Sequence, residues 1–233
     1  MSIKVALVTG GSKGIGFGIA ESLLKDGYKV AITSRSQKSA DEAAVALGYA
    51  ENVLAIEANA KDYTSQQNTV NAIINKWGQL DVLIANAGVG HFAAIDEMDI
   101  DLWHDIIDTN LTGVFYSIKA SVEEIKKSKG HILTISSLAG TNFFEKGSAY
   151  NASKFGLTGF TQSVMLDLRK YGVKVSTIMP GSVASHFNDH NPNAVNDAWK
   201  IQPEDMGQLI SDLLKMPART LPSKVEIRPT TPK

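Results

Sequence analysis

Cysteine is absent from the 233-residue sequence. Without it, the chain has no disulfide bonds, no thiolate metal ligands and no cysteine nucleophile. Such a composition suits a reducing compartment, and we therefore expect a cytoplasmic protein.

Long apolar runs and an excess of charge are missing as well. No run approaches the roughly 20 apolar residues that cross a bilayer, and the apolar segment from Met1 to Thr9 is too short for a signal peptide. The 23 basic and 24 acidic side chains give a formal net charge of −1, which provides no attraction for nucleic acid or an anionic membrane. We expect neither as a partner.

No segment rich in serine, glycine or proline divides the chain. A chain of 233 residues is long enough to bury the core of one sizeable domain, and two domains would need a linker. We expect a single domain over residues 1–233.

What the sequence does contain is a regular alternation of apolar runs and helical patterns. A long helical region is expected from about Met98 to Lys127, with an interruption near Asn110. Continuous apolar strands separated by helices are typical of a parallel sheet covered on both faces. The predicted fold class is α/β, with a doubly wound parallel sheet and helices on both faces. Six apolar runs predict its strands, at residues 3–8, 28–33, 53–58, 80–85, 132–135 and 173–179.

A glycine-rich loop follows the first of these strands. Its glycines have the spacing Gly10-x3-Gly14-x-Gly16 and lead directly into a helix. Glycine permits positive φ and a close approach of the backbone to a phosphate, and a helix N-terminus attracts the pyrophosphate of a dinucleotide. We expect this loop, which includes Ser12 and Ile15, to bind a nucleotide. The alternative is an ordinary tight turn.

The end of the second strand indicates which dinucleotide is bound. An NAD site has a carboxylate about 20 residues beyond the glycine loop, for the ribose 2′-hydroxyl. This chain has Arg35 there and no acidic residue before Asp41. Arg35, together with Lys13 in the loop, is suited to pair with a 2′-phosphate. The predicted cofactor is NADP(H); the alternative is that both cations are merely solvated.

Tyr150 and Lys154 are four residues apart, so they share one face of a predicted helix. The phenol has an ordinary pKa of about 10, which a neighbouring ammonium lowers, and such a pair is suited to acid–base catalysis. Ser137, just beyond the strand that ends at Ile135, is placed to hold a substrate oxygen opposite the phenol. The alternative is a chance pairing on a long helix.

Together these motifs resemble the classical short-chain dehydrogenase/reductase family in their order and spacing. The resemblance covers nearly the whole chain. It implies a single-domain Rossmann-type sheet of about seven strands, in which one domain carries both the cofactor site and the active site. The matching elements are the loop from Thr9 to Gly16, Asn86-Ala87-Gly88, Asn110, Ser137, Tyr150-x3-Lys154 and Pro180-Gly181.

The resemblance also implies a role for each catalytic residue. Tyr150 resembles the general acid of carbonyl reduction and the base of alcohol oxidation. Lys154 would lower the pKa of Tyr150 and bind the nicotinamide ribose. Ser137 would polarise the carbonyl, and Asn110 would hold a water in a proton relay. Cofactor contacts are implied at Gly10, Ser12, Lys13, Gly14, Ile15, Gly16, Arg35, Asn59, Ala60, Asn86, Ala87, Gly88, Tyr150, Lys154, Pro180, Gly181, Val183 and Ser185.

The chain departs from the family pattern at three places. Asn59 replaces an aspartate with which many members contact the adenine, and Ser185 stands where threonine is common. The C-terminus, from Val225 to Pro229, lacks the Asp-Gly-Gly ending common in 3-oxoacyl-acyl-carrier-protein reductases. This last difference argues against that substrate.

A lid, residues 182–200, is expected to cover the substrate site. His186 and His190 lie four residues apart with Asp189 between them, which suggests a metal site. A polar lid without a metal is favoured, because no third ligand is indicated.

Other aromatic and histidine residues are assigned more ordinary positions. His91 and Phe92 follow the Asn86-Ala87-Gly88 turn and are expected to border the pocket. His104 and His131 are expected on the surfaces of a helix and a strand.

Small residues form a stripe on the helix that carries Tyr150, at Ala152, Gly156, Gly159 and Ser163. Glycine inside a helix costs about 1 kcal/mol, so a close-packed neighbour is expected to compensate. In the family this helix forms a subunit interface, which implies a homodimer or homotetramer. The alternative is close packing within one chain.

The main hypothesis is an NADP(H)-dependent carbonyl reductase or alcohol dehydrogenase that acts on a small molecule. The alternative from another class is a non-catalytic NADP-binding redox sensor, which would have no need to keep the four catalytic residues together. A dehydratase or epimerase is disfavoured by the short, single-domain chain.

Overall fold

Seven parallel strands form one sheet in the order β3-β2-β1-β4-β5-β6-β7. The computed structural model describes residues 3–232, and its Rossmann-like arrangement is the predicted fold class. The six strands predicted from apolar runs are present to within a few residues of the predicted bounds. The strands are β1 (Val5–Val8), β2 (Lys29–Ser34), β3 (Val53–Glu57), β4 (Val82–Ala85), β5 (His131–Ile135), β6 (Lys174–Pro180) and β7 (Lys224–Ile227).

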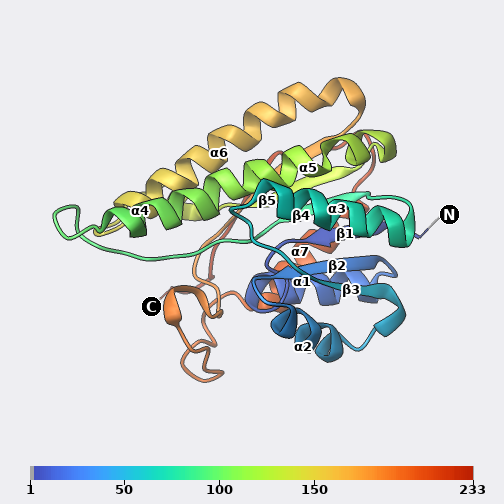
Figure 1. Cartoon of the computed structure of the whole chain (residues 1–233). Helices are drawn as coiled ribbons and strands as arrows, with labels where there is room; N and C mark the ends of the chain where they lie inside the picture. Colours follow the sequence, from blue (N-terminus) through green and yellow to red (C-terminus); the bar gives the residue numbers. More distant parts are fainter. Residues whose placement is uncertain (1–2, 233) are drawn as a thin grey trace.

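Helices cover both faces of the sheet (Figure 1). One face packs against α1, α2 and α7, and the other against α3, α5 and α6. No helix within residues 3–232 combines the length and apolar character needed to cross a membrane. The helices are α1 (Gly14–Lys25), α2 (Gln37–Leu47), α3 (Tyr63–Trp77), α4 (Ile100–Ile107), α5 (Gly113–Ser128), α6 (Ser148–Leu168) and α7 (Pro203–Lys215).

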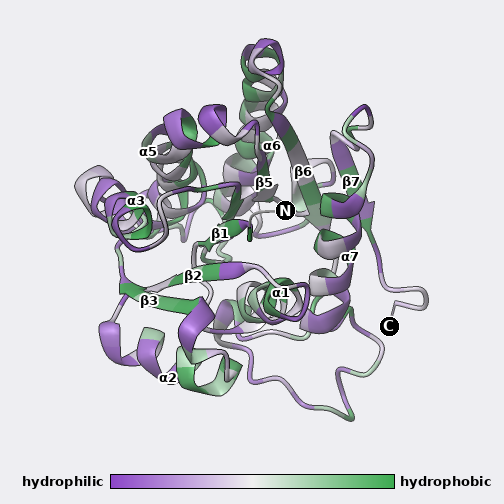
Figure 2. Ribbon diagram, turned by 90° about the vertical axis from the view of Figure 1, so that its right-hand side faces the viewer, coloured by the Kyte–Doolittle hydropathy of each residue, from purple (hydrophilic) through white to green (hydrophobic). Residues whose placement is uncertain are grey.

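The two helical layers explain why the central strands read as continuous apolar runs. In β4, Val82 and Ile84 belong to the core on the α1 side, whereas Leu83 and Ala85 belong to the core on the α5 side. All four residues are buried, and Figure 2 shows hydrophobic ribbon through the centre of the molecule, with hydrophilic positions on the outer helices. A strand buried on both faces has no polar side to alternate with.

The predicted interruption of the long helical region is confirmed. Between α4 and α5 the chain makes a π-helical turn, η2 (Asp108–Thr112), and Asn110 at its centre is completely buried. Turns of this kind widen a helix locally and are frequent at functional sites.

The expectation that His131 lies on a strand surface is wrong. His131 begins β5 and is only 6% exposed, and its Nε2 lies 2.8 Å from Ser176 Oγ on β6. The Ser176 hydroxyl donates its hydrogen to the Pro222 carbonyl, so it accepts from Nε2–H of His131. Burial lowers the pKa of His131 to about 3, with a further lowering from Lys174 and Lys4.

This buried imidazole makes the stability of the fold depend on pH. Because the folded-state pKa lies below the unfolded value of about 6.5, the unfolded chain binds the proton first as the pH falls. The contribution of His131 to the free energy of unfolding is therefore fully present above about pH 6.5. It decreases below that pH by up to about 1.4 kcal/mol per pH unit.

We predict that His131→Gln, which retains a neutral hydrogen-bond donor, removes about 2 kcal/mol of the stability difference between pH 7 and pH 5. Urea unfolding of both proteins at the two pH values measures this. His104→Gln, a change on an exposed helix position, is the control. An unchanged pH dependence in His131→Gln would show that the buried imidazole is not responsible.

Candidate active site

A single long cleft crosses the carboxyl ends of the strands. It has a volume of about 1940 Å³ and runs from the glycine loop after β1 to the first turns of α6. Ligands of open parallel sheets bind at this edge, and typical small-molecule pockets measure about 300–1,000 Å³. The cleft therefore has room for a dinucleotide and a substrate side by side.

The glycine loop forms one wall of the cleft. Gly10 and Gly14 have φ values of +63° and +56°, a left-handed conformation that favours glycine. Helix α1 begins at Gly14, and no side chain caps its first turn, so its free N–H groups are available to an anion. Gly16 does not line the cleft. It lies behind the wall, where it packs so closely against the Gly10 carbonyl that a Cβ at this position would collide with it.

A hydrogen-bonded bracket holds this loop to the end of β4. The Thr9 hydroxyl accepts from the backbone N–H groups of Asn86 (3.0 Å) and Ala87 (3.1 Å). The Asn86 amide donates to the carbonyls of Thr9 (2.9 Å) and Gly10 (3.1 Å). The structural role of Thr9 was not predicted, and the side chain of Asn86 is used mainly to fix the loop.

Two cations stand where the loop meets the end of β2. Arg35 directly follows β2 and Lys13 precedes α1; both are exposed and line the cleft. Neither forms an ion pair with any residue in the described range 3–232. Between them Ser12 Oγ donates to Ser34 Oγ at 3.1 Å. Asn59 lies nearby with its side chain folded back onto Lys61 N.

The opposite end of the cleft brings together Ser137, Tyr150 and Lys154. Tyr150 and Lys154 lie one turn apart in α6 and are 7% and 5% exposed. Lys154 Nζ donates to the Ile135 carbonyl at the end of β5 (3.0 Å) and lies 5.7 Å from the centre of the Tyr150 ring. Ser137 caps the short turn η3 (Leu138–Gly140), which places its hydroxyl just beyond β5.

Asn110 ties the π-helical turn to this end of the site without lining the cleft. Its Oδ1 accepts from Val89 N (2.8 Å), and its Nδ2 donates to Val89 O (2.9 Å) and Ser153 Oγ (3.2 Å). A Cβ on Gly88 would lie 3.2 Å from the same Oδ1. Asn110 thus joins η2, the segment after β4 and the helix that carries Tyr150.

Comparison with known proteins agrees with this geometry. The family model described as short chain dehydrogenase matches residues 4–195. The chain belongs to this family. It is therefore a member of an oxidoreductase family that binds nicotinamide cofactors.

Individual short-chain dehydrogenases are similar over most of the chain. An uncharacterized oxidoreductase of Staphylococcus saprophyticus is 34% identical, over 97% of each chain. A 3-oxoacyl-[acyl-carrier-protein] reductase of Staphylococcus aureus is 36% identical, over 85% of this chain and 80% of its own length. The structure of an alcohol dehydrogenase from the archaeon Thermococcus sibiricus, complexed with 5-hydroxy-NADP, has a TM-score of 0.90, 26% identity and full coverage of both chains.

The acidity of the tyrosine in this short-chain dehydrogenase differs from the expectation. Lys154 was expected to lower the pKa of Tyr150. Instead, burial raises the pKa of Tyr150 to about 12, against a smaller opposite effect from a hydrogen bond with Ser137. Burial also lowers the pKa of Lys154 to about 8, so the amine carries only part of its charge near that pH. Desolvation is the largest cause of both pKa changes.

The remaining residues predicted for the cofactor line the same cleft. They share positions on its walls between the glycine loop and the lid, and comprise Ser12, Ile15, Asn59, Ala60, Ala87, Gly88, Pro180, Gly181, Val183 and Ser185. Ser185 is close to the glycine loop, since a Cβ built on Gly14 would lie 3.2 Å from the Cβ of Ser185.

The lid is a closed loop organised by one buried carboxylate. Its ends meet where Val183 pairs with Ile201. Asp197 is 4% exposed and accepts from His190 Nε2 (2.7 Å), Lys200 Nζ (2.7 Å) and Asn193 N (2.8 Å). These donors hold the pKa of Asp197 well below its usual range. Among the described side chains no three His, Cys, Asp or Glu groups gather as metal ligands.

Aromatic side chains surround Tyr150 on the substrate side. Of the two residues expected to border the pocket, Phe92 lines the cleft and His91 does not. The Phe92 ring lies edge-on to Tyr150 at 5.5 Å. Phe144 was not predicted, although it lies in the twelve-residue segment between Ser137 and Tyr150 that has to fold over the phenol. Its ring packs edge-on against Phe92 at 5.2 Å.

We predict that Asn110→Ala lowers the free energy of unfolding by about 2–4 kcal/mol, because the N–H and carbonyl of Val89 lose their partner in a part-buried site. Urea unfolding at pH 7 measures the change. Asn68→Ala, on the exposed face of α3, should change the same quantity by less than about 0.5 kcal/mol. A loss below about 1 kcal/mol in Asn110→Ala would mean that the amide does not hold these segments together.

Proposed function

We propose that this short-chain dehydrogenase is an NADP(H)-dependent enzyme that transfers hydride between the nicotinamide and a small carbonyl or alcohol substrate, with Tyr150 as the general acid and base. The observation that carries the proposal is the convergence of Ser137, Tyr150 and Lys154 at one end of a cleft whose other wall is the glycine loop. One domain, residues 1–233, would hold the cofactor and perform the chemistry, and the lid would cover the substrate.

The residues of the cleft fit a phosphorylated dinucleotide. The uncapped first turn of α1 and the positive φ of Gly14 leave N–H groups free for the pyrophosphate. Lys13 and Arg35 would hold the 2′-phosphate, and Lys154 the nicotinamide ribose. When bound, NADP(H) supplies the hydride for the carbonyl carbon.

The chain supplies the proton and the orientation of the substrate. A phenol whose pKa is raised to about 12 stays protonated at neutral pH, which is the form that can donate to a carbonyl oxygen during reduction. The Ser137 hydroxyl would donate to the same carbonyl oxygen and fix its direction. Lys154, together with a water held by Asn110, would then relay a proton from solvent to Tyr150.

The preference for NADP over NAD follows from the charges at the end of β2. Arg35 and Lys13 are both free of ion pairs within residues 3–232, so each is available to a phosphate. The acidic side chain on the neighbouring strand, Glu57, also lines the cleft, and its Oε2 accepts from Gln37 N. A charge-assisted hydrogen bond is worth about 1.5–3 kcal/mol.

An oligomer built on α6 completes the proposal. Ala152, Gly159 and Ser163 are exposed in the single chain, and a Cβ on Gly159 would meet no atom within 4 Å. Only Gly156 of this stripe packs closely, against Leu111. Close packing within one chain therefore does not account for Gly159, and a second copy of the chain, in a homodimer or homotetramer, would.

We predict that Tyr150→Phe retains NADPH binding while NADPH-dependent ketone reduction falls by at least about 100-fold, because the ring remains and the transferable proton is lost. Fluorescence titration with NADPH and the loss of nicotinamide absorbance measure the two properties. Tyr171→Phe, outside the cleft, is the control. Unchanged turnover in Tyr150→Phe would remove the tyrosine from the mechanism, and a wild-type protein that binds NADPH but reduces no ketone would favour the redox sensor.

We predict that Arg35→Ala weakens NADPH binding by about 10- to 100-fold and NADH binding by less than about threefold, since only the former carries the 2′-phosphate. Titration of both cofactors measures the ratio. Arg169→Ala, at the exposed end of α6, provides a matched loss of charge elsewhere. Equal losses for NADPH and NADH would contradict the NADP assignment.

A further inference from the structure

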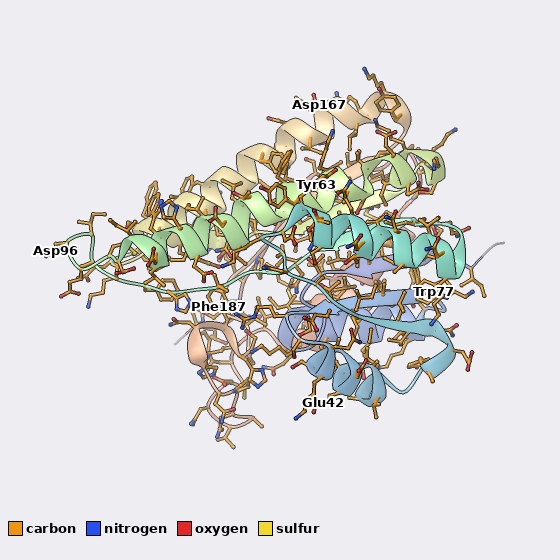
Figure 3. The ribbon with its side chains drawn as sticks, in the orientation of Figure 1. Glu42, Tyr63, Trp77, Asp96, Asp167 and Phe187 are labelled. Atoms are coloured by element: carbon orange, nitrogen blue, oxygen red, sulfur yellow. The ribbon has the colours of Figure 1, made fainter. Side chains whose placement is uncertain are left out.

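The ring of Phe187 packs over the catalytic tyrosine from the lid. Phe187 begins the short turn η5 (Phe187–Asp189), and its ring centre lies 5.4 Å from that of Tyr150 and 6.4 Å from that of Phe92. In Figure 3 it lies between the orange lid segment that carries it and the green segment that leads from β4 to α4. Phe144 completes the enclosure at 6.4 Å from Tyr150.

A single glycine makes room for this ring. A Cβ built on Gly90 would overlap three carbon atoms of the Phe187 ring and would meet nothing else closer than that ring. The φ of Gly90 is outside the left-handed region, so its backbone would accept alanine. Position 90 therefore needs glycine because the Phe187 ring occupies the space of a side chain there, and not because of its backbone conformation.

Two basic side chains of the lid, His190 and Lys200, are already paired. His190 and Lys200 both line the cleft, and both are bonded to the buried carboxylate of Asp197. Lys154 is turned toward the Ile135 carbonyl. An anionic substituent on the substrate would have to compete with these contacts, whereas a flat apolar group would find the aromatic rings of Phe92, Phe144 and Phe187 on the wall of the cleft.

We infer that Phe187, seated on Gly90, determines substrate specificity, and that the substrate is a ketone or alcohol whose reacting carbon carries an uncharged, ring-bearing substituent. This inference rests on the proposed function and narrows its substrate class. The substituent packs against Phe92, Phe144 and Phe187, while the oxygen on the reacting carbon of the substrate reaches Tyr150 and Ser137. Phe187 positions the substrate and takes no part in proton transfer.

Three methyl ketones with similar dialkyl carbonyl groups test the substrate class. They are phenylacetone, which carries a ring, butanone, which is small and apolar, and levulinate, which is anionic. With NADPH, we expect kcat/KM for phenylacetone to exceed that for each of the other two by about tenfold or more, since one aromatic contact is worth about that factor. A wild-type preference for levulinate, or no preference among the three, overturns the inference.

Variants at the two contacting positions test the role of Phe187. Phe187→Ala should raise KM for phenylacetone by about tenfold with kcat nearly unchanged, because the ring binds ground state and transition state alike. The loss of kcat/KM for butanone should be clearly smaller than the loss for phenylacetone, and Phe187→Tyr should restore the wild-type KM for phenylacetone. Tyr49→Ala, which removes an exposed aromatic ring outside the cleft, is the control.

A double-mutant cycle isolates the seat of the ring. Gly90→Ala should lower kcat/KM for phenylacetone as much as Phe187→Ala does, and the double variant should be no worse than Phe187→Ala alone. Additive losses, or equal losses for butanone, overturn the inference while NADPH-dependent reduction still stands. If no ketone is reduced by a wild-type protein that binds NADPH, the proposed function fails and takes the substrate inference with it.

Discussion

The burial of two titratable side chains one helical turn apart is the constraint on which this site depends. Tyr150 and Lys154 are both buried, and among residues 3–232 the Lys154 amine has only the Ile135 carbonyl as its hydrogen-bond partner. Desolvation favours the neutral form of each group. A proton is therefore kept on the phenol and held loosely on the amine. Preserving this arrangement requires walls that do not admit water freely, and the sheet and its two helical layers supply them.

The sequence predicted those parts of the fold whose burial is uniform. Strand β4 could be predicted because both faces of Val82 to Ala85 are covered, which leaves a continuous apolar run. The interruption near Asn110 could be predicted from a break in the helical pattern. The edge strand β7 was not, because Lys224 to Ile227 alternate exposed and half-buried positions, and its existence was implied only by the family resemblance. Helix α7 was also overlooked, although Pro203 at its start and the spacing of Met206, Ile210 and Leu213 carry a clear signal.

The candidate site was predicted by residue type more accurately than by physical state. Ser137, Tyr150 and Lys154 converge as expected, but the acidity of the tyrosine depends on desolvation, which a sequence does not report. Gly16 and Asn110 do not line the cleft but support it from behind. The sequence could not predict this, because their packing partners, such as the Gly10 carbonyl and Val89, are known only once the chain has folded. The misplacement of His131 has the same origin: its partner on β6 is 45 residues away.

The two ends of the cleft differ in how they are built, and this difference bears on specificity. The end proposed for the cofactor is made by the termini of β1, β2 and β4, which the sheet fixes, and by Thr9 and Asn86, which join two strand ends directly. The end proposed for the substrate is made by loops: the segment after β4, the segment before α6 and residues 182–200. Loops tolerate changes in sequence that a central strand does not, so the same scaffold can keep one cofactor while its substrate changes. In this chain the lid is held by Asp197, and the ring that it presents to Tyr150 fits because position 90 has no side chain.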